Sequence, residues 1–328
     1  MDRSALAPLK RHYSSLGMAC FLYLAVSTMA QGLVAGICAV AAPQLLETGW
    51  FLLAASFLPM YLIGFPIFCW RLPKAPAVLP APRTMPVKDL LICLLMCFGL
   101  LYPLNLLGSG VTALLNRLLG TAQVNPIAAL VDSANPWLYA LFAVVLGPIM
   151  EELTFRKLLI DRMRTIDKPA AVLFSALAFG LFHGNLSQFF YAFALGIFFG
   201  FLYVKTGRIR YTIVLHILVN FFGSMVTMLL LPYIDMAALD SVTLGAADAL
   251  GALLPSLPAL LGLAVYGLCM LSAAIAGIAL LISRRKRFQL ADEADRLSPA
   301  QRFRLPFLNP GMALYILAAA VVFALSLG

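Results

Sequence analysis

Charged side chains are scarce in this sequence. Only 11% of its 328 residues are Asp, Glu, Lys or Arg, whereas 62% are hydrophobic. A soluble domain usually carries about 25% charged residues. A chain of this length has too little polar surface to cover so much apolar material. The scarcity therefore excludes an ordinary water-soluble domain and indicates that lipid is the solvent.

Cysteines in a metal-binding or redox spacing are also missing. No CxxC or zinc-knuckle pattern occurs, and all six cysteines fall inside apolar stretches. Such cysteines behave as small hydrophobic residues. We therefore predict buried cysteines and infer no disulfide framework. The six are Cys20, Cys38, Cys69, Cys93, Cys97 and Cys269.

Long apolar runs, in contrast, follow one another along the chain. The runs are continuous rather than alternating, which argues against membrane strands. Because a membrane-spanning helix needs about 20 apolar residues, we predict an all-α, polytopic transmembrane helical bundle of about 8–9 spans. The candidate ranges are 15–42, 50–70, 89–115, 136–158, 170–185, 187–205, 211–232, 256–283 and 310–327.

The net charge of +9 is concentrated in short loops between these runs. This distribution is typical of topology signals and argues against nucleic acid as a partner; the bilayer is the expected partner. We predict an integral protein of the plasma membrane with a cytoplasmic N-terminus and, for nine spans, an external C-terminus. The first apolar run is too long for a cleaved signal peptide and is predicted to remain as a span.

Ionisable residues inside the apolar runs are few. The chain has four glutamates and three histidines, and Glu151, Glu152, His183 and His216 lie within or beside apolar runs. At such depth an ionisable group costs several kcal/mol unless it is paired or faces a water-filled cavity. These four residues are therefore candidates for function.

Glu152 and Arg156 are four residues apart, with the acid on the N-terminal side, which is the favourable order on a helix. Glu151 is rotated by about 100° from Glu152 on an ideal helix, so one glutamate can pair with Arg156 while the other points elsewhere. Pro148 removes one backbone hydrogen bond and can bend the helix just before the pair. A structural ion pair would explain Glu152 and Arg156 equally well.

Two histidine motifs follow. His216 and Asn220 share one helix face, and an interhelical polar clamp would explain them when taken alone. A bond to a backbone carbonyl would explain His183. Together with Glu151, these residues could supply a general base, an electrostatic stabiliser and oxyanion donors. Glu151, His183 and His216 could equally form a zinc site with an open water position.

His183 poses a problem of depth. It lies 14 positions beyond Pro169, which is about 20 Å of helix, whereas Glu151 and His216 lie closer to basic loop residues. We therefore expect the helix over 170–185 to tilt or to start deeper in the membrane, and the cavity to open inward.

The ordered set of motifs resembles the CPBP family, which comprises CAAX proteases and bacteriocin-processing enzymes and is also called the Abi family. The family pattern is EExxxR, then FxxxH, then HxxxN or HxxxD. The resemblance covers residues 90–232. The matching residues are Glu151-Glu152…Arg156, Phe179…His183 and His216…Asn220. The motifs of other intramembrane proteases, HExxH, GxGD and GxSG, do not occur in the sequence.

The resemblance implies an intramembrane endopeptidase that acts on a membrane-associated peptide or protein, such as a prenylated CAAX-type substrate or a bacteriocin-like peptide. It implies that Glu151 and His183 activate water and that His216 and Asn220 stabilise the oxyanion. Supporting roles fall to two further residues, Glu152 and Arg156.

Three questions stay open at this point. Participation of a divalent metal such as zinc is undecided. A non-catalytic bacteriocin-immunity or regulatory scaffold of the same fold is an alternative function. A transporter with a buried Glu/His proton relay is another, although the sequence shows no inverted repeat to support it.

The sequence predicts three regions. Residues 1–88 form a two-span region that ends in a proline-rich cytoplasmic linker, 73–86. Residues 89–232 form the catalytic core. Residues 233–328 form peripheral spans with a basic cytoplasmic loop, in which 283–305 is either an amphipathic helix or a flexible link.

Overall fold

The computed structural model describes residues 3–74, 82–121, 135–243, 249–290 and 297–327, and within these ranges every regular element is a helix. The α-helices are α1 (Arg3–Ala41), α2 (Gly49–Pro59), α3 (Phe65–Arg71), α4 (Val87–Leu119), α6 (Pro136–Tyr139), α7 (Gly147–Glu151), α8 (Lys168–Phe182), α9 (Leu186–Thr206), α10 (Ile209–Asn220), α11 (Val226–Leu230), α12 (Met236–Thr243), α13 (Ala249–Leu253), α14 (Leu257–Ser283), α15 (Pro299–Phe307) and α16 (Pro310–Leu325).

Shorter helical segments of other types join several of these α-helices. Four are π-helical, namely η2 (Met60–Gly64), η3 (Ala140–Leu146), η4 (Glu152–Ile160) and η5 (Phe221–Met225). Four are 3₁₀-helical, namely η1 (Pro43–Glu47), η6 (Leu231–Tyr233), η7 (Leu254–Ser256) and η8 (Arg285–Arg287).

Seven helical stretches in the described ranges are long and apolar enough to span a membrane, or eight if α15 and α16, which meet at 58°, form one bent span. The predicted all-α, polytopic bundle is therefore confirmed. The range predicted at 170–185 corresponds to α8, which has 15 residues. That is about 22 Å of helix, less than the roughly 30 Å of hydrocarbon that a span must cross.

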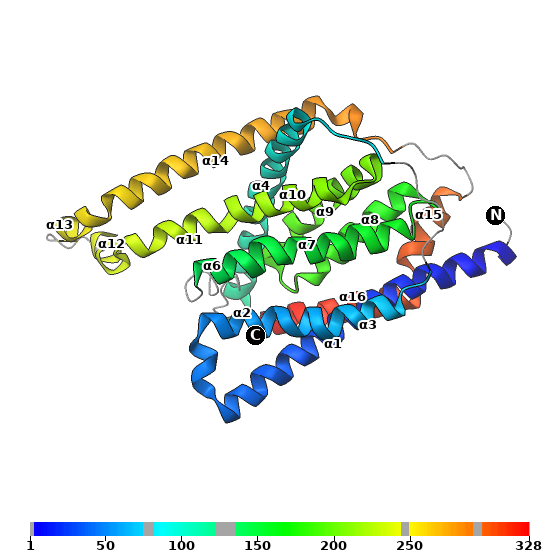
Figure 1. Cartoon of the computed structure of the whole chain (residues 1–328), viewed down its shortest axis with the longest axis horizontal. Helices are drawn as coiled ribbons and strands as arrows, with labels where there is room; N and C mark the ends of the chain where they lie inside the picture. The colour runs from blue at the N-terminus through cyan, green and yellow to red at the C-terminus, as the bar shows by residue number, and fades with distance from the viewer. Residues whose placement is uncertain (1–2, 75–81, 122–134, 244–248, 291–296, 328) are drawn as a thin grey trace.

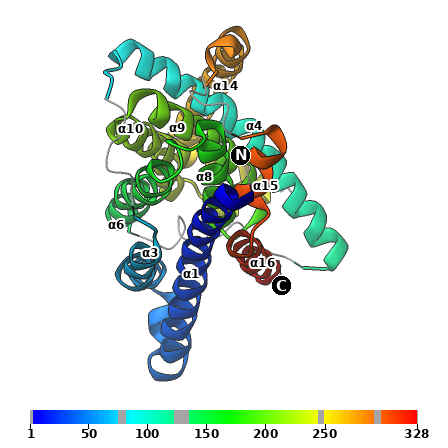
Figure 2. The same cartoon turned by 90° about the vertical axis from the view of Figure 1, so that its right-hand side faces the viewer.

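Most helices run along the long axis of the molecule, while α4 crosses them at a steep angle (Figures 1 and 2). Three apolar clusters hold the bundle together. The first joins α1, α3, η4, α8 and α16, the second joins α4, α9 and α10, and the third joins α2, η3 and α11. Helix α16 thus packs on α8, and α1 contacts α8 through the stacked rings of Tyr23 and Phe182. The division into three regions remains a prediction.

Glycine permits the close approach of α14 to α4. A Cβ atom on Gly277 would collide with the backbone carbonyl of Leu95, and one on Gly99 would lie 2.6 Å from the backbone nitrogen of Ile278. The two backbones are therefore in contact, as is common where small residues line a helix interface in a membrane.

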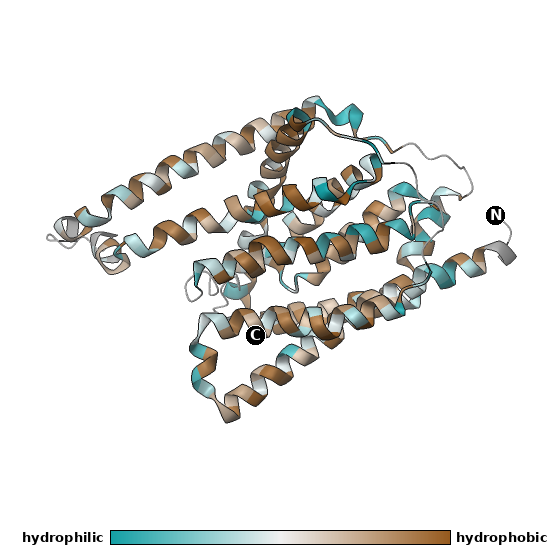
Figure 3. Ribbon diagram, in the orientation of Figure 1, coloured by the Kyte–Doolittle hydropathy of each residue, from teal (hydrophilic) through white to brown (hydrophobic). Residues whose placement is uncertain are grey.

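The basic loops meet at one end of the bundle, together with the N-terminal part of α1. His12 Nε2 lies 2.8 Å from the Arg162 carbonyl, and Arg162 Nε donates to the Pro73 carbonyl at 2.6 Å. The backbone N–H of Arg83 donates to the Thr206 carbonyl at 2.7 Å. Figure 3 shows hydrophobic residues along the helices and hydrophilic residues gathered near this end.

The C-terminal part of α16 lies at the opposite end. Gly184 follows the end of α8 that is remote from the basic loops, and a Cβ on Gly184 would lie 2.8 Å from Cγ1 of Val322. The two ends of the described chain are therefore on opposite sides of the bundle (Figure 1).

Two loop predictions have partial outcomes. Residues 75–81 of the linker and 291–296 of the C-terminal segment lie outside the described ranges. The described parts of 283–305 include η8 and the start of α15, whose N-cap Ser298 forms a capping box with Gln301. A helix is thus present in part of this segment.

The prediction of buried cysteines is wrong for part of the set. All six are free thiols, as the spacing indicated, but only three are buried. Cys69 and Cys269 are exposed, on faces of spans that are available to lipid, where a small apolar thiol needs no protein partner. The buried three are Cys20, Cys93 and Cys97, and Cys38 is intermediate.

Candidate active site

The span that carries both candidate glutamates is not a regular α-helix. Two π-helical segments, η3 and η4, flank the short helix α7. Such segments are rare and often occur at functional sites. In η3 the Gly147 N–H bonds to the Phe142 carbonyl, so in this register the Ala143 carbonyl would face Pro148, which has no N–H. Asn220 Nδ2 fills the gap by donating to the Ala143 carbonyl at 3.0 Å.

Glu152 and Arg156 form the predicted i, i+4 ion pair. The distance from Arg156 Nε to Glu152 Oε2 is 3.2 Å, and both side chains are fully buried. The guanidinium carbon of Arg156 lies 4.2 Å from the centre of the Phe179 ring and 5.5 Å from that of Phe199. Helices α8 and α9 thus each place an aromatic ring against the cation.

His216 lies between the two glutamates. Its Nδ1 is 3.0 Å from Glu152 Oε1, and its Nε2 is 3.5 Å from Glu151 Oε2. With the Nδ1–H donating to Glu152, the ring orientation is fixed and Nε2 faces Glu151. The side chain of Glu151 is 21% exposed, whereas that of Glu152 is 0% exposed. Glu151 is therefore the glutamate that water can reach.

His183 follows α8 directly as its C-cap residue. Its Nδ1 lies 2.9 Å from the Phe179 carbonyl. A carbonyl can only accept, so Nδ1 carries the proton and Nε2 of the neutral ring is an acceptor. The Phe179 ring contacts the rings of both His183 and His216, at centroid distances of 4.7 Å and 5.7 Å. His183 also interacts electrostatically with Glu151, so its distance from the basic loops does not separate it from the cluster.

The six candidate residues therefore share one region inside the bundle. Glu151, Glu152, Arg156 and His216 are in direct contact as a chain of ionisable side chains, and His183 joins them through Phe179. Asn220 faces the same span one turn further along α10, where its amide bonds to Ala143.

A three-ligand zinc site does not fit this arrangement. Glu151 and His216 are separated by 3.5 Å, a spacing that two ligands of one zinc ion can adopt. However, both ring nitrogens of His216 already face carboxylates, and the described residues include no group of three His, Cys, Asp or Glu side chains placed to hold one ion.

Three tyrosines near Glu151 were not identified from the sequence. Tyr23 of α1, Tyr61 of η2 and Tyr191 of α9 each interact electrostatically with Glu151. The hydroxyl of Tyr61 is buried and has no hydrogen-bond partner among the described atoms, and it lies 3.7 Å from the position of a Cβ on Gly147. The chain holds 11 tyrosines, and no spacing singles out these three.

Part of the chain is similar to known proteins. Residues 133–222 match the Rce1-like family, described as Type II CAAX prenyl endopeptidase Rce1-like. The match contains all six candidate residues. It confirms the resemblance to the CPBP family over residues 133–222.

Two curated relatives share part of the chain. The protein named "Putative membrane peptidase YdiL" of Bacillus subtilis (strain 168) is 35% identical over 79 residues, which is 24% of this chain and 32% of that protein. The "Membrane-embedded CAAX protease MroQ" of Staphylococcus aureus (strain USA300) is 27% identical over 121 residues, which is 34% of this chain and 49% of that protein. The chain thus spans between about a third and a half of these relatives. No solved structure matches the chain.

Proposed function

We propose that the chain is an intramembrane endopeptidase that hydrolyses a peptide bond of a membrane-associated substrate. The placement of Glu151 is the observation that carries the proposal. It is a water-accessible carboxylate, 3.5 Å from a histidine that is itself held by a buried glutamate. The family match over the same residues supports a peptidase.

In the proposed reaction, Glu151 and His183 activate a water molecule. The Glu151 carboxylate takes a proton from the water as the general base, and Nε2 of His183 accepts a hydrogen bond from the same water because Nδ1 donates to the Phe179 carbonyl. The hydroxide attacks the peptide carbonyl carbon. When the C–N bond breaks, the departing amine receives the proton, so one water is divided between the new carboxyl and amino ends.

His216 is proposed to stabilise the oxyanion through a proton on Nε2. The bond from its Nδ1 to Glu152 holds the ring in place, and Arg156 balances the charge of Glu152. A donor fixed in this way needs no reorientation as charge develops. Asn220 has two amide N–H groups; one fixes the helix at Ala143, and the other is available as the second oxyanion donor.

The proposed substrate class is a CAAX-type prenylated peptide. The family description and the name of the staphylococcal relative both refer to CAAX substrates. The basic loops meet at the end of the bundle that also holds His12, so the positive-inside rule makes this end cytoplasmic. We therefore propose a plasma-membrane protein with a cytoplasmic N-terminus and a site that receives substrate from that side.

The test compares Glu151→Gln with wild type in lipid nanodiscs. The probes are a farnesylated CAAX peptide carrying a fluorophore and quencher, and the same peptide without the farnesyl group. Loss of a general base should lower the rate by about 100-fold or more. Glu47→Gln is the matched control, because Glu47 is exposed and lies far from the site in sequence.

Full activity of Glu151→Gln would rule out the mechanism, and absence of cleavage by the wild-type protein would favour the non-catalytic scaffold. Equal cleavage of both peptides would exclude prenyl recognition while leaving the peptidase in place. A chelator arm, in which the wild-type protein is dialysed against EDTA before the assay, decides whether activity needs a divalent metal.

A further inference from the structure

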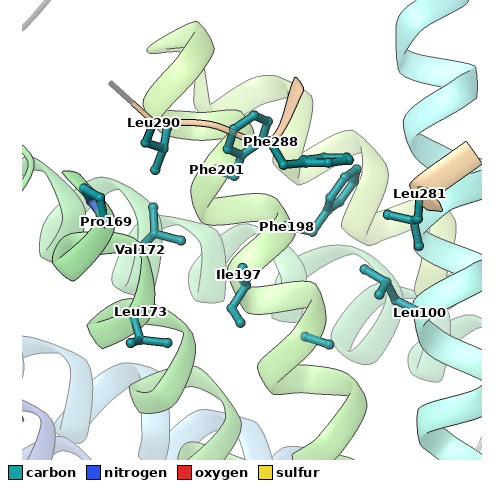
Figure 4. A pocket seen from close by; sticks show the side chains of 11 residues that line it. Leu100, Pro169, Val172, Leu173, Ile197, Phe198, Phe201, Leu281, Phe288 and Leu290 are labelled. Atoms are coloured by element: carbon teal, nitrogen blue, oxygen red, sulfur yellow. The ribbon is translucent and has the colours of Figure 1, made fainter. Parts of the chain in front are cut away.

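A second region with the features of a binding site lies apart from the candidate active site. A cavity of about 460 Å³ is formed where α4, α8, α9 and α14 meet. Its volume falls within the roughly 300–1,000 Å³ typical of ligand pockets. Its lining is apolar throughout and includes no candidate active-site residue. Figure 4 shows the side chains of α8, α9 and the loop after α14 pointing into this common space.

One face of α9 forms the floor of the cavity. Ala194, Ile197, Phe198 and Phe201 follow the i, i+3, i+4, i+7 spacing of a single helix face, and all four line the cavity. They extend over about 10 Å of helix. Phe199, in contrast, packs against His216, with ring centroids 5.4 Å apart. The cavity and the candidate active site therefore use different faces of α9.

The outer end of the cavity is aromatic and closes against a basic patch. Phe288, directly after η8, lies over Phe201 and Phe198 at ring distances of 5.2 Å and 6.0 Å. The Lys205 ammonium lies 5.6 Å from the centre of the Phe201 ring. Positive charge thus begins where the apolar lining ends.

A second cavity of about 650 Å³ adjoins the first and shares Leu290 with it. Its lining contains three cations and no acidic residue: Lys205, Lys286 and Arg287, together with Gln289 and Leu290. All three cations are exposed. They come from the last turn of α9 and from η8, at the end of the bundle where the basic loops meet.

We propose that the two cavities form one site for an anionic phospholipid. One acyl chain occupies the apolar cavity along α9, and the phosphate binds Lys205, Lys286 and Arg287. The order of features matches such a lipid, because its charged group lies at the membrane surface and its chain extends inward. Basic pockets between membrane helices bind lipid headgroups by this complementarity, at about 1 kcal/mol per cation near the surface.

The test measures lipid binding directly and needs no activity. The full-length protein, purified in detergent, is titrated with phosphatidylglycerol or phosphatidylcholine and examined by native mass spectrometry. The first variant is Lys205→Gln/Lys286→Gln/Arg287→Gln. A control with the same change of charge is Lys10→Gln/Arg11→Gln/Lys74→Gln, whose exposed side chains lie outside both cavities.

Wild type should bind phosphatidylglycerol at least about tenfold more tightly than phosphatidylcholine, as expected for a little more than one charge contact. The first variant should lose this preference, and the control should keep it. A separate variant, Ile197→Trp, fills the apolar cavity from a side chain that is 38% exposed and should weaken binding of both lipids. Retained folding of each variant is checked by thermal unfolding.

Three results would overturn the proposal. The first is equal binding of the two lipids by wild type. The second is a preference for phosphatidylglycerol that survives in the Lys205→Gln/Lys286→Gln/Arg287→Gln variant or disappears equally in the control. The third is displacement of phosphatidylglycerol by a farnesylated peptide in wild type but not in Ile197→Trp, which would assign the cavity to the substrate's lipid group.

Discussion

Removal of the buried cation beside the glutamates should destabilise the whole bundle. In the variant Arg156→Met, a side chain of similar length replaces the guanidinium and leaves Glu152 without its ion-pair partner. Both groups are fully buried, and the Nε to Oε2 distance is 3.2 Å. Because the carboxylate is fully buried, it must either stay charged against His216 alone or take up a proton.

The expected cost follows from this burial. Removing one partner of a buried ion pair typically costs about 3–5 kcal/mol, because the remaining charge is left uncompensated. His216 still donates to Glu152 at 3.0 Å, so the expected loss of stability lies at the lower end of this range. We therefore expect Arg156→Met to lower the free energy of unfolding by about 3 kcal/mol.

The assay is a double-mutant cycle read by unfolding in a denaturing detergent. The single variants are Arg156→Met and Glu152→Gln, and the double variant combines both substitutions. Glutamine can still accept the Nδ1–H of His216, so the double variant removes both charges and keeps that bond. Its loss of stability should be smaller than the sum of the two single losses, by about 1–3 kcal/mol.

An ion pair whose cation is partly exposed, at the end of the same segment, serves as the control. Lys157 Nζ lies 2.7 Å from Asp161 Oδ2, but the lysine side chain is 44% exposed. Lys157→Met should therefore cost no more than about 1 kcal/mol. Equal losses in Lys157→Met and Arg156→Met, or single losses that simply add, would show that burial of the pair does not carry the stability assigned to it.

Two further predictions concern the backbone. Asn220→Ala leaves the Ala143 carbonyl without a partner and should lower the free energy of unfolding by about 1–3 kcal/mol. Adding Pro148→Ala to this variant supplies a new N–H and should restore part of the lost stability. No rescue would contradict the assigned role of the Asn220 amide. Gly277→Leu should separate α14 from α4 and lower the stability by about 1–3 kcal/mol or more in a thermal unfolding assay. Gly267→Leu, with no atom within 4 Å of its Cβ position, should change the stability little. Equal losses of stability in the two variants would contradict the close helix contact.

The sequence was sufficient to predict the helical bundle and the composition of the cluster. Continuous apolar runs can only be satisfied as helices in lipid, and buried ionisable groups must find one another. The ion pair of Glu152 and Arg156 depends only on their separation by four residues, so it forms in the π-helical segment η4 although an ideal α-helix was assumed in predicting it.

Other features depend on contacts that spacing alone does not specify. The π-helical register around Pro148 depends on Asn220 donating from another helix, 77 residues away. The nearness of Tyr61 to Glu151 depends on how η2 packs on its neighbours. The number of spans was uncertain because the apolar run of α8 is real but only 15 residues long. The exposed Cys69 shows that hydrophobicity predicts burial poorly where lipid is the solvent.

The contact between α16 and α8 makes the site dependent on the order of synthesis. Tyr315 of α16 is fully buried and its hydroxyl donates to the Ala178 carbonyl on α8, at 2.6 Å. Ala178 immediately precedes Phe179, the ring shared by both histidines and the arginine. Since α16 leaves the ribosome after every helix that carries a candidate site residue, the wall behind the histidines closes only when α16 has been made. A nascent or truncated protein without α16 is thus expected to insert into the membrane with an unfinished site.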